Sequence, residues 1–255
     1  MSFNFFMKRP GSEPKEKKEK TVKPSPKVEV KAPANIPVSN NKALDAKNNQ
    51  VYAFIDASNL FWGGKESIGF RIDYKKLLNY LKQNHGVTKA FYYGGLRIFD
   101  FDFSILDNKD LNLSLVEEHL QKAEAEAEEK ERLLIQKSLN KVNFYKLLES
   151  YGFIMKIKPA KVFYSDEDEE QTAPILKANC DVDMTFDMMR YMQQYSGVVA
   201  MTGDGDFASV LSYLKSHDRS IIIVSRWDRT ASEIRKIAGE DFVDFEKLRG
   251  QIYLR

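Results

Sequence analysis

The sequence predicts an α/β fold, a three-layer α/β/α sandwich around a central, mostly parallel sheet. From Val51 onward, short apolar segments alternate with amphipathic segments of helical period, which is the pattern of strands joined by crossover helices. The apolar segments lack a polar face, as expected of strands that helices cover on both sides. With 255 residues, 43% of them hydrophobic, the chain can bury a sizeable core.

The first elements have clear signals. Val51–Ile55 is an apolar run and predicts a strand. The next expected element is a helix over Asp73–His85, because Gly86 stands where a glycine commonly ends a helix and the apolar residues recur at core spacing: Tyr74, Leu77, Leu78 and Leu81. Lys89–Tyr93 is expected as the second strand.

A long charged insert follows. Leu115–Leu139 is rich in Glu, Lys and Ala, which favour helix, and it leads into a second helical stretch at Asn143–Ser150. We expect residues 113–150 to form a helical arm that gates a site, or that contacts a second copy of the chain or another protein.

The alternation resumes after the insert. A helix is expected over Asp181–Tyr195, with Val182, Phe186 and Met189 on one face. The other expected elements are strands at Phe153–Ile157, Lys161–Tyr164, Val198–Met201, Ser220–Ser225 and Phe242–Phe245, and helices at Phe207–His217 and Thr230–Ala238. An acidic loop at 165–170 is expected to be a solvated turn.

Residues 1–50 differ in composition from the rest and are expected to be disordered. They hold six prolines in a Lys/Glu-rich, aromatic-poor run, with 11 Lys/Arg against 5 Asp/Glu. The remainder carries 28 basic and 32 acidic residues, so a basic arm precedes an acidic domain. The arm either binds nucleic acid or an acidic surface, or serves as a solubilising linker. We expect the domain at 51–248 and a short tail at 249–255.

Two classes of protein are excluded by the sequence. No apolar run is long enough to span a membrane, and the lone Cys180 excludes an internal disulfide framework. A cytoplasmic protein is therefore expected.

Carboxylates follow two of the predicted strands. Asp204 and Asp206 flank a glycine just after Val198–Met201, and Asp56 follows the first strand, with the Asn59 amide nearby. Open α/β sheets bind their ligands at the carboxyl ends of the strands. Helix capping is the competing interpretation for Asp56 and for Asp206.

A third acidic group lies on the predicted helix before the strand Val198–Met201. Asp183 and Asp187 are four residues apart, opposite Val182 and Phe186, which predicts a solvated face. Asp181 begins the helix and either stabilises its N-terminus or joins a site. A convergent site best explains why three segments supply Asp56, Asp181 and Asp204/Asp206. Carboxylates without His or Cys favour Mg²⁺ or Mn²⁺, which bind phosphate oxygens, so metal-assisted phosphodiester hydrolysis is predicted.

At these residues the sequence resembles the NYN domain family, PIN-like domains considered to be metal-dependent ribonucleases. The resemblance covers roughly Val51–Leu248 apart from the insert, although Asn179-Cys180 stands where the family often has a glycine and an apolar residue. The matching stretches are Phe54–Leu60, Phe91–Gly94, Lys177–Asp183 with Asp187, Thr202–Phe207, Ser232–Ile234 and Asp241–Asp244.

The resemblance implies a PIN-like fold with its acidic residues at the carboxyl edge of the sheet. By position, it implies metal-binding catalytic roles for four residues, with Asn59, Asp187 and Thr202 in support: Asp56, Asp181, Asp204 and Asp206. Asp56 and Asp204 are the expected direct ligands. Asp181 and Asp206 would ligate through water or orient the nucleophile, and Asp206 alternatively caps the helix at Phe207.

The implied substrate is RNA, and the acidic domain favours single-stranded RNA over tight nonspecific binding to a duplex. Lys177, Arg97 and Arg226 are candidates for phosphate binding, although surface cations are usually only solvated. Trp62, which precedes a glycine pair, and Tyr92 and Tyr93 are candidates for stacking on bases, with packing under a loop as the competing interpretation.

Two other functions are left open. An RNA-binding or regulatory scaffold would keep the fold without turnover. A haloacid-dehalogenase-type phosphatase also carries sheet-edge aspartates and a segment like Gly203–Gly205, but it needs a second aspartate two residues after the first, where Ser58 stands. The phosphatase therefore ranks third.

Overall fold

The computed structural model describes residues 49–61, 70–107, 110–163 and 175–254. Within these residues, six strands form one parallel sheet in the order β3-β2-β1-β6-β7-β8. The strands are β1 (Val51–Asp56), β2 (Val87–Leu96), β3 (Ile154–Pro159), β6 (Gly197–Met201), β7 (Ser220–Ser225) and β8 (Phe242–Asp244). A separate antiparallel pair joins β4 (Lys161–Phe163) to β5 (Ile175–Lys177). The three expected layers are confirmed.

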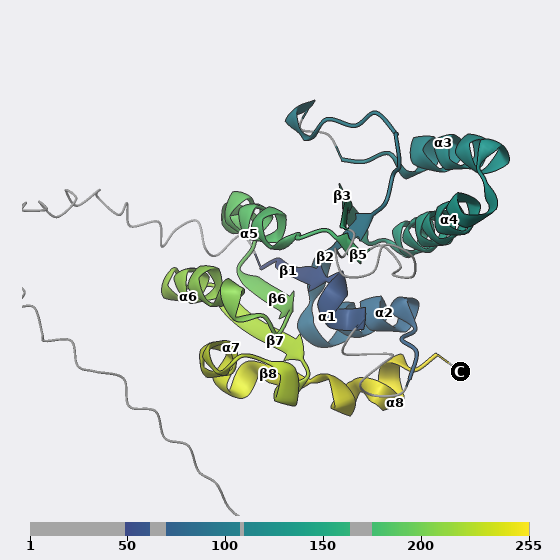
Figure 1. The fold of residues 1–255 in the computed structure, drawn as a ribbon. Coiled ribbons are helices and arrows are strands. Elements are labelled where there is room, and N and C mark those ends of the chain that lie inside the picture. Colours follow the sequence, from purple (N-terminus) through teal and green to yellow (C-terminus); the bar gives the residue numbers. More distant parts are fainter. Residues whose placement is uncertain (1–48, 62–69, 108–109, 164–174, 255) are drawn as a thin grey trace, which may run out of the picture. The chain divides into compact units, whose positions relative to one another are not determined.

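Helices cover both faces of the sheet, as Figure 1 shows, with α5, α6 and α7 on one side and α2, α4 and α8 on the other. The period of two along β1 explains the layers: Ala53 and Ile55 join one core cluster, and Tyr52 and Phe54 join the other. The helices are α1 (Ala57–Phe61), α2 (Tyr74–His85), α3 (Leu113–Glu126), α4 (Glu129–Tyr151), α5 (Asp181–Arg190), α6 (Ala208–Ser216), α7 (Ser232–Ala238) and α8 (Arg249–Ile252). No helix within the described ranges combines the length and apolarity needed to cross a lipid bilayer.

The order of the strands places a topological switch point between β1 and β6. The chain builds β2 and β3 on one side of β1 and then returns to the other side with β6. Ile55 of β1 pairs with Met201 of β6, so Asp56 and the loop after Met201 leave the sheet at the same edge. Ligands of open α/β sheets bind at such points.

The charged insert is integrated into the domain rather than being a separate arm. The expected helix at Asn143–Ser150 is the end of one continuous helix, α4, which connects toward β3. Val142, Tyr145 and Leu148 of this half are buried in the core, and α3 packs on α4. Gly94 and Gly95 of β2 permit the close approach, because an added Cβ at Gly94 would lie 2.6 Å from the Tyr145 hydroxyl oxygen.

The predicted orientation of α5 is wrong. Val182 and Phe186 are 73% and 60% exposed, and the buried positions of the helix are instead Met184, Asp187 and Met188. The helix has two apolar stripes at four-residue spacing, and the one with the two methionines faces the core. Burying Asp187 on this side is tolerated because its carboxylate has a hydrogen-bond donor in the core, as described below.

The segment after Leu248, expected to be a tail, forms helix α8. Ile252 is fully buried, and its carbonyl accepts a hydrogen bond from the Asp73 backbone N–H at 2.8 Å. Ile72 and Tyr253 form an antiparallel bridge, so the C-terminal end of α8 contacts the residues that lead into α2. The expected disordered tail at residues 1–50 lies almost entirely outside the described residues, as does the acidic loop at 165–170.

Candidate metal centre

Three carboxylates converge at the carboxyl edge of the sheet. One oxygen from each of Asp181, Asp204 and Asp206 lies within 4.8 Å of the other two. Asp181 begins α5, and the other two lie in the loop between β6 and α6. Asp204 and Asp206 are exposed, so a ligand from solvent can reach them. We call these three residues the acidic triad.

The loop after β6 is held by its own side chains. The buried Thr202 Oγ1 accepts a hydrogen bond from the Asp204 N–H at 3.2 Å, and Asp204 Oδ1 accepts one from the Asp206 N–H at 3.0 Å. Asp204 therefore caps the 3₁₀ turn Gly205–Phe207. Capping was the alternative role for Asp206, beside that of an outer ligand, and the structure gives the cap to Asp204, because the extended backbone there directs its carboxylate over the turn.

The two glycines of this loop let the next loop pack closely. An added Cβ at Gly203 would lie 3.0 Å from the Arg229 carbonyl oxygen, and one at Gly205 would lie 3.2 Å from Ala231 Cβ. The Gly203 carbonyl also accepts the Ala231 N–H at 2.9 Å. The Gly-Asp-Gly-Asp pattern thus combines two carboxylates with the small residues that their loop requires.

Asp56 lies beside the acidic triad. It ends β1, and its Oδ1 accepts a hydrogen bond from the Ser58 N–H at 2.9 Å, which gives it a capping role as well. Burial raises the pKa of Asp181, and the next causes are the negative charges of Asp56 and Asp204. Asp56 is therefore close enough for its negative charge to act on Asp181.

The site is electrostatically unbalanced. Within the described ranges, no lysine, arginine or histidine forms an ion pair with any member of the acidic triad. Crowded carboxylates either take up protons or attract a cation. The pKa of Asp181 is raised first by burial and then by these neighbouring negative charges. Hard oxygen donors with no nitrogen or sulfur ligand fit a divalent cation such as Mg²⁺ or Mn²⁺.

The other two aspartates of α5 do not join the acidic triad. Asp183 forms an ion pair with Lys158 at 2.7 Å. Asp187 is buried, not solvated as the helical period suggested, and accepts a hydrogen bond from the Tyr93 hydroxyl at 3.0 Å. Sequence reasoning missed this pair, although Tyr93 follows Phe91 by two residues and so faces α5. Tyr92 and Tyr93 are both buried and cannot stack on bases.

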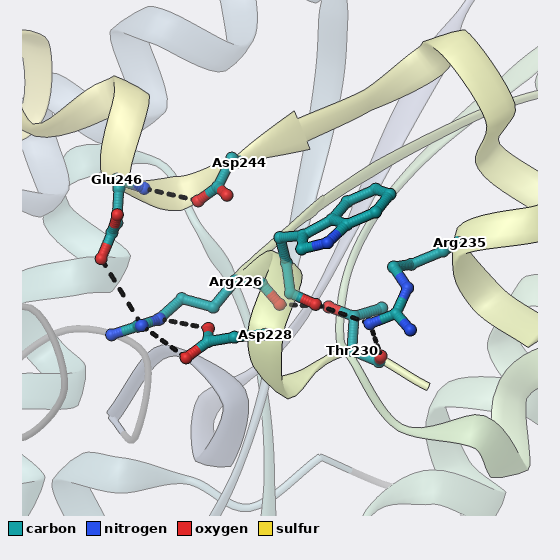
Figure 2. A network of polar contacts seen from close by, with 7 residues as sticks. Arg226, Asp228, Thr230, Arg235, Asp244 and Glu246 are labelled. Carbon is teal, nitrogen blue, oxygen red and sulfur yellow. Dashed lines mark hydrogen bonds and ion pairs between the residues drawn. The ribbon is translucent and has the colours of Figure 1, made fainter. Parts of the chain in front are cut away.

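Arg226, which follows β7, forms hydrogen bonds and an ion pair with nearby acidic residues (Figure 2). Its guanidinium makes two hydrogen bonds to Asp228, at 2.8 and 2.7 Å, and lies 3.5 Å from Glu246. In the same network, Arg235 donates to the Thr230 carbonyl at 2.7 Å. This network holds the connection from β7 to α7 in place, and that connection packs on Gly203. Arg226 therefore stabilises the loop of Asp204 and Asp206 indirectly.

The remaining candidates are less informative. The Arg97 guanidinium lies 4.3 Å over the Phe99 ring, and its Nη1 has no hydrogen-bond partner among the described residues. Asn59 lies in α1 and Lys177 in β5, but their side chains are outside what the structure describes. Trp62 lies outside the described residues altogether.

A parallel α/β/α domain with carboxylates gathered at its switch point has the architecture of PIN-like domains. The chain belongs to the NYN domain family, whose model matches residues 50–246. This confirms the family that the sequence motifs indicated.

Other proteins share this similarity at low sequence identity. The low amplitude and bright protein LabA of Synechococcus elongatus is 23% identical over 201 residues, which are 78% of this chain and 85% of LabA. The crystal structure of a protein of unknown function, VPA0982 from Vibrio parahaemolyticus, superposes with a TM-score of 0.50 at 17% identity, over 81% of this chain and 97% of that one. The T5 D15 protein, crystallised with metal ions, gives a TM-score of 0.39 at 13% identity, over 73% and 59%.

Proposed function

We propose that the protein is a ribonuclease that hydrolyses phosphodiester bonds of single-stranded RNA and depends on Mg²⁺ or Mn²⁺. The observation that carries this proposal is the convergence of Asp181, Asp204 and Asp206 oxygens within 4.8 Å, without an ion-pair partner in the described part of the chain. Membership of the NYN domain family, whose domains are PIN-like nucleases, supports it.

The four aspartates would contribute to cation binding in different ways. Asp204 Oδ1 accepts the Asp206 N–H, which fixes the orientation of the carboxylate and leaves Oδ2 for the cation. Asp56 is fixed in the same way by Ser58. Asp181 and Asp206 add negative charge around the cation and bind it directly or through water. A bound divalent cation supplies a water of lowered pKa and stabilises the leaving oxygen.

The choice of substrate follows from charge. Residues 51–255 carry 28 basic and 32 acidic side chains, which disfavours tight nonspecific binding to the dense charge of a duplex. A single strand can enter a site that neutralises only a few phosphates. The lone Cys180 is buried, which suits the reducing cytoplasm.

The test is cleavage of end-labelled single-stranded RNA by the full chain with Mn²⁺ or Mg²⁺, and with EDTA. Asp204→Asn should lower the rate more than about 100-fold, since even partners of metal ligands commonly contribute 10–100-fold. Asp241→Asn is the matched control and should cleave normally, because the exposed Asp241 precedes β8 at the opposite edge of the sheet.

Two results would overturn the proposal. Equal cleavage by Asp204→Asn would indicate a contaminant or a different site. Retained RNA binding without metal-dependent cleavage by the native chain would favour the RNA-binding scaffold. Membership of the NYN family leaves the haloacid-dehalogenase-type phosphatase without support.

A further inference from the structure

A cavity of about 290 Å³ lies next to the metal centre. It is bounded by the ends of β2 and β3, by the segment before α3, and by one side of α5. Cys180, which lines the cavity, directly precedes Asp181 of the acidic triad. The metal centre and the cavity therefore share the beginning of α5.

Asp187 presents a carboxylate oxygen to this cavity without a donor. The side chain is only 6% exposed, and its Oδ2 accepts the Tyr93 hydroxyl at 3.0 Å. Burial and the neighbouring Asp187 raise the pKa of Tyr93, so this hydroxyl keeps its proton and donates. No other donor within the described ranges reaches the carboxylate. Oδ1 of Asp187 is therefore open to the cavity, and a ligand that donates hydrogen bonds to it would be stabilised here.

The charges of the cavity select an uncharged ligand. Lys156 pairs with Asp110 at 2.9 Å, and Lys158 pairs with Asp183 at 2.7 Å. Both lysines are thus neutralised by carboxylates of the same cavity. An anionic group beside Asp187 would be repelled by its carboxylate, and neither lysine is unpaired to offset this repulsion. The cation of the lining without a carboxylate partner among the described residues is Arg190.

Aromatic rings and one arginine form the rim. Phe186 is 60% exposed, which is unusual for a phenyl ring, and it lines the cavity together with Tyr191. The Arg190 guanidinium lies over both rings, 6.0 and 5.6 Å from their centres, and pairs with no carboxylate of the described residues. Rings and a cation at the mouth of a pocket suit a base and its adjoining phosphate.

The size of the cavity limits the ligand. Its volume of about 290 Å³ is at the lower end of the roughly 300–1,000 Å³ of small-molecule pockets. A single base fits this space better than a longer ligand. Asp181 and Asp187 are six residues apart on one helix, roughly 9 Å along its axis. That separation suits a phosphate at the metal centre and a neighbouring base at Asp187.

We propose that this cavity binds a guanine base of the RNA, with the Asp187 carboxylate accepting hydrogen bonds from the guanine N1–H and N2 amino groups. Guanine alone among the four bases presents two adjacent donors, which match a carboxylate. Uracil offers one donor, N3–H, between two carbonyl oxygens that the carboxylate would repel. Adenine and cytosine each place an unprotonated ring nitrogen beside their amino group. The position beside the cleaved phosphate rests on the proposed nuclease function, whereas binding of the base does not.

The test is calorimetric binding of GMP, AMP, CMP and UMP to the full chain in EDTA, which needs no catalysis. GMP should bind at least about fivefold more tightly than the others, the lower limit for a good bidentate pair. Asp187→Asn should remove this preference. Phe186→Ala, at an exposed position that tolerates truncation, should weaken the binding of all four.

The outcomes separate the two proposals. Equal binding of all four nucleotides, no binding, or an unchanged preference in Asp187→Asn would overturn the guanine pocket, even if the native chain cleaves RNA with metal. A guanine preference in a chain that does not cleave RNA would support the pocket and overturn the nuclease. If both proposals hold, mapped cleavage sites should lie next to guanines.

Discussion

Asp181→Asn should stabilise the metal-free protein, although it removes a charge from the start of a helix. At 4.8 Å and in the dielectric of bulk water, two unit charges repel by about 0.9 kcal/mol. The bulk value is appropriate because the two neighbours, Asp204 and Asp206, are exposed. Relief of these two repulsions contributes about 1.7 kcal/mol, a lower limit because burial of the Asp181 charge and its repulsion by Asp56 act in the same direction. The lost interaction with the N-terminus of α5 costs roughly 0.3–1 kcal/mol.

The expected net gain is about 1 kcal/mol, which raises the Tm by roughly 2–4 °C for a domain of this size. The assay is thermal unfolding in EDTA at low ionic strength, where screening is weak. Asp183→Asn is the matched control on the same helix. It breaks the ion pair with Lys158 and should lower the Tm slightly or leave it unchanged.

Divalent metal should reverse the order of the Tm values. A ligand at 100 times its Kd stabilises the native state by about 2.7 kcal/mol, so Mn²⁺ should raise the Tm of the native chain above that of Asp181→Asn. The contrary result would be an Asp181→Asn variant with a lower Tm than the native chain in EDTA, and with the same difference in Tm when Mn²⁺ is present. Asp181 would then be a structural residue at the start of α5.

The remaining predictions concern pH and packing. The pKa of Asp181 is raised above its ordinary value of 3.8, so the folded state binds the proton of this carboxyl group more tightly than the unfolded state does. As the pH falls through the raised pKa, the metal-free native chain loses this charge, and its Tm should approach that of Asp181→Asn. Gly95→Ala should cost about 1–3 kcal/mol in urea unfolding, because its Cβ would overlap that of Ala178, whereas Gly250→Ala, with open space around it, should not destabilise. Tyr145→Phe should lower the unfolding free energy by about 0.5–1.5 kcal/mol, through loss of the 2.9 Å hydrogen bond to the Gly95 carbonyl.

The fold and most of the acidic centre could be predicted because their signals are local. The central strands β1 and β6 are apolar runs, and Asp56 and Asp204 follow where these runs end. The adjacency of β1 and β6 could be expected from the parallel pattern, and it places Asp56 near the loop of Asp204. The sequence left open whether Asp206 is a cap or a ligand, because backbone angles at Asp204 decide which carboxylate covers the turn.

Non-local contacts explain the other differences. On α5, the stripes with Val182 and with Met184 are equally consistent with a helix, and only the Tyr93 hydroxyl, far along the chain, makes burial of Asp187 acceptable. Likewise, nothing within the insert shows that Tyr145 lies against Gly94. The partner Asp228 is only two residues from Arg226, but the contact of Arg226 with Glu246, twenty residues away, could not be read from the sequence.

Asp181, Asp204 and Asp206 are expected to hold a divalent cation. The most direct measurement is the anomalous difference density of crystals of the full chain grown with Mn²⁺. A peak bonded to carboxylate oxygens of Asp204 and its neighbours, and lost in Asp204→Asn, is the predicted result. Mn²⁺ bound only elsewhere, or no peak at millimolar Mn²⁺ with the three carboxylates in place, would contradict it.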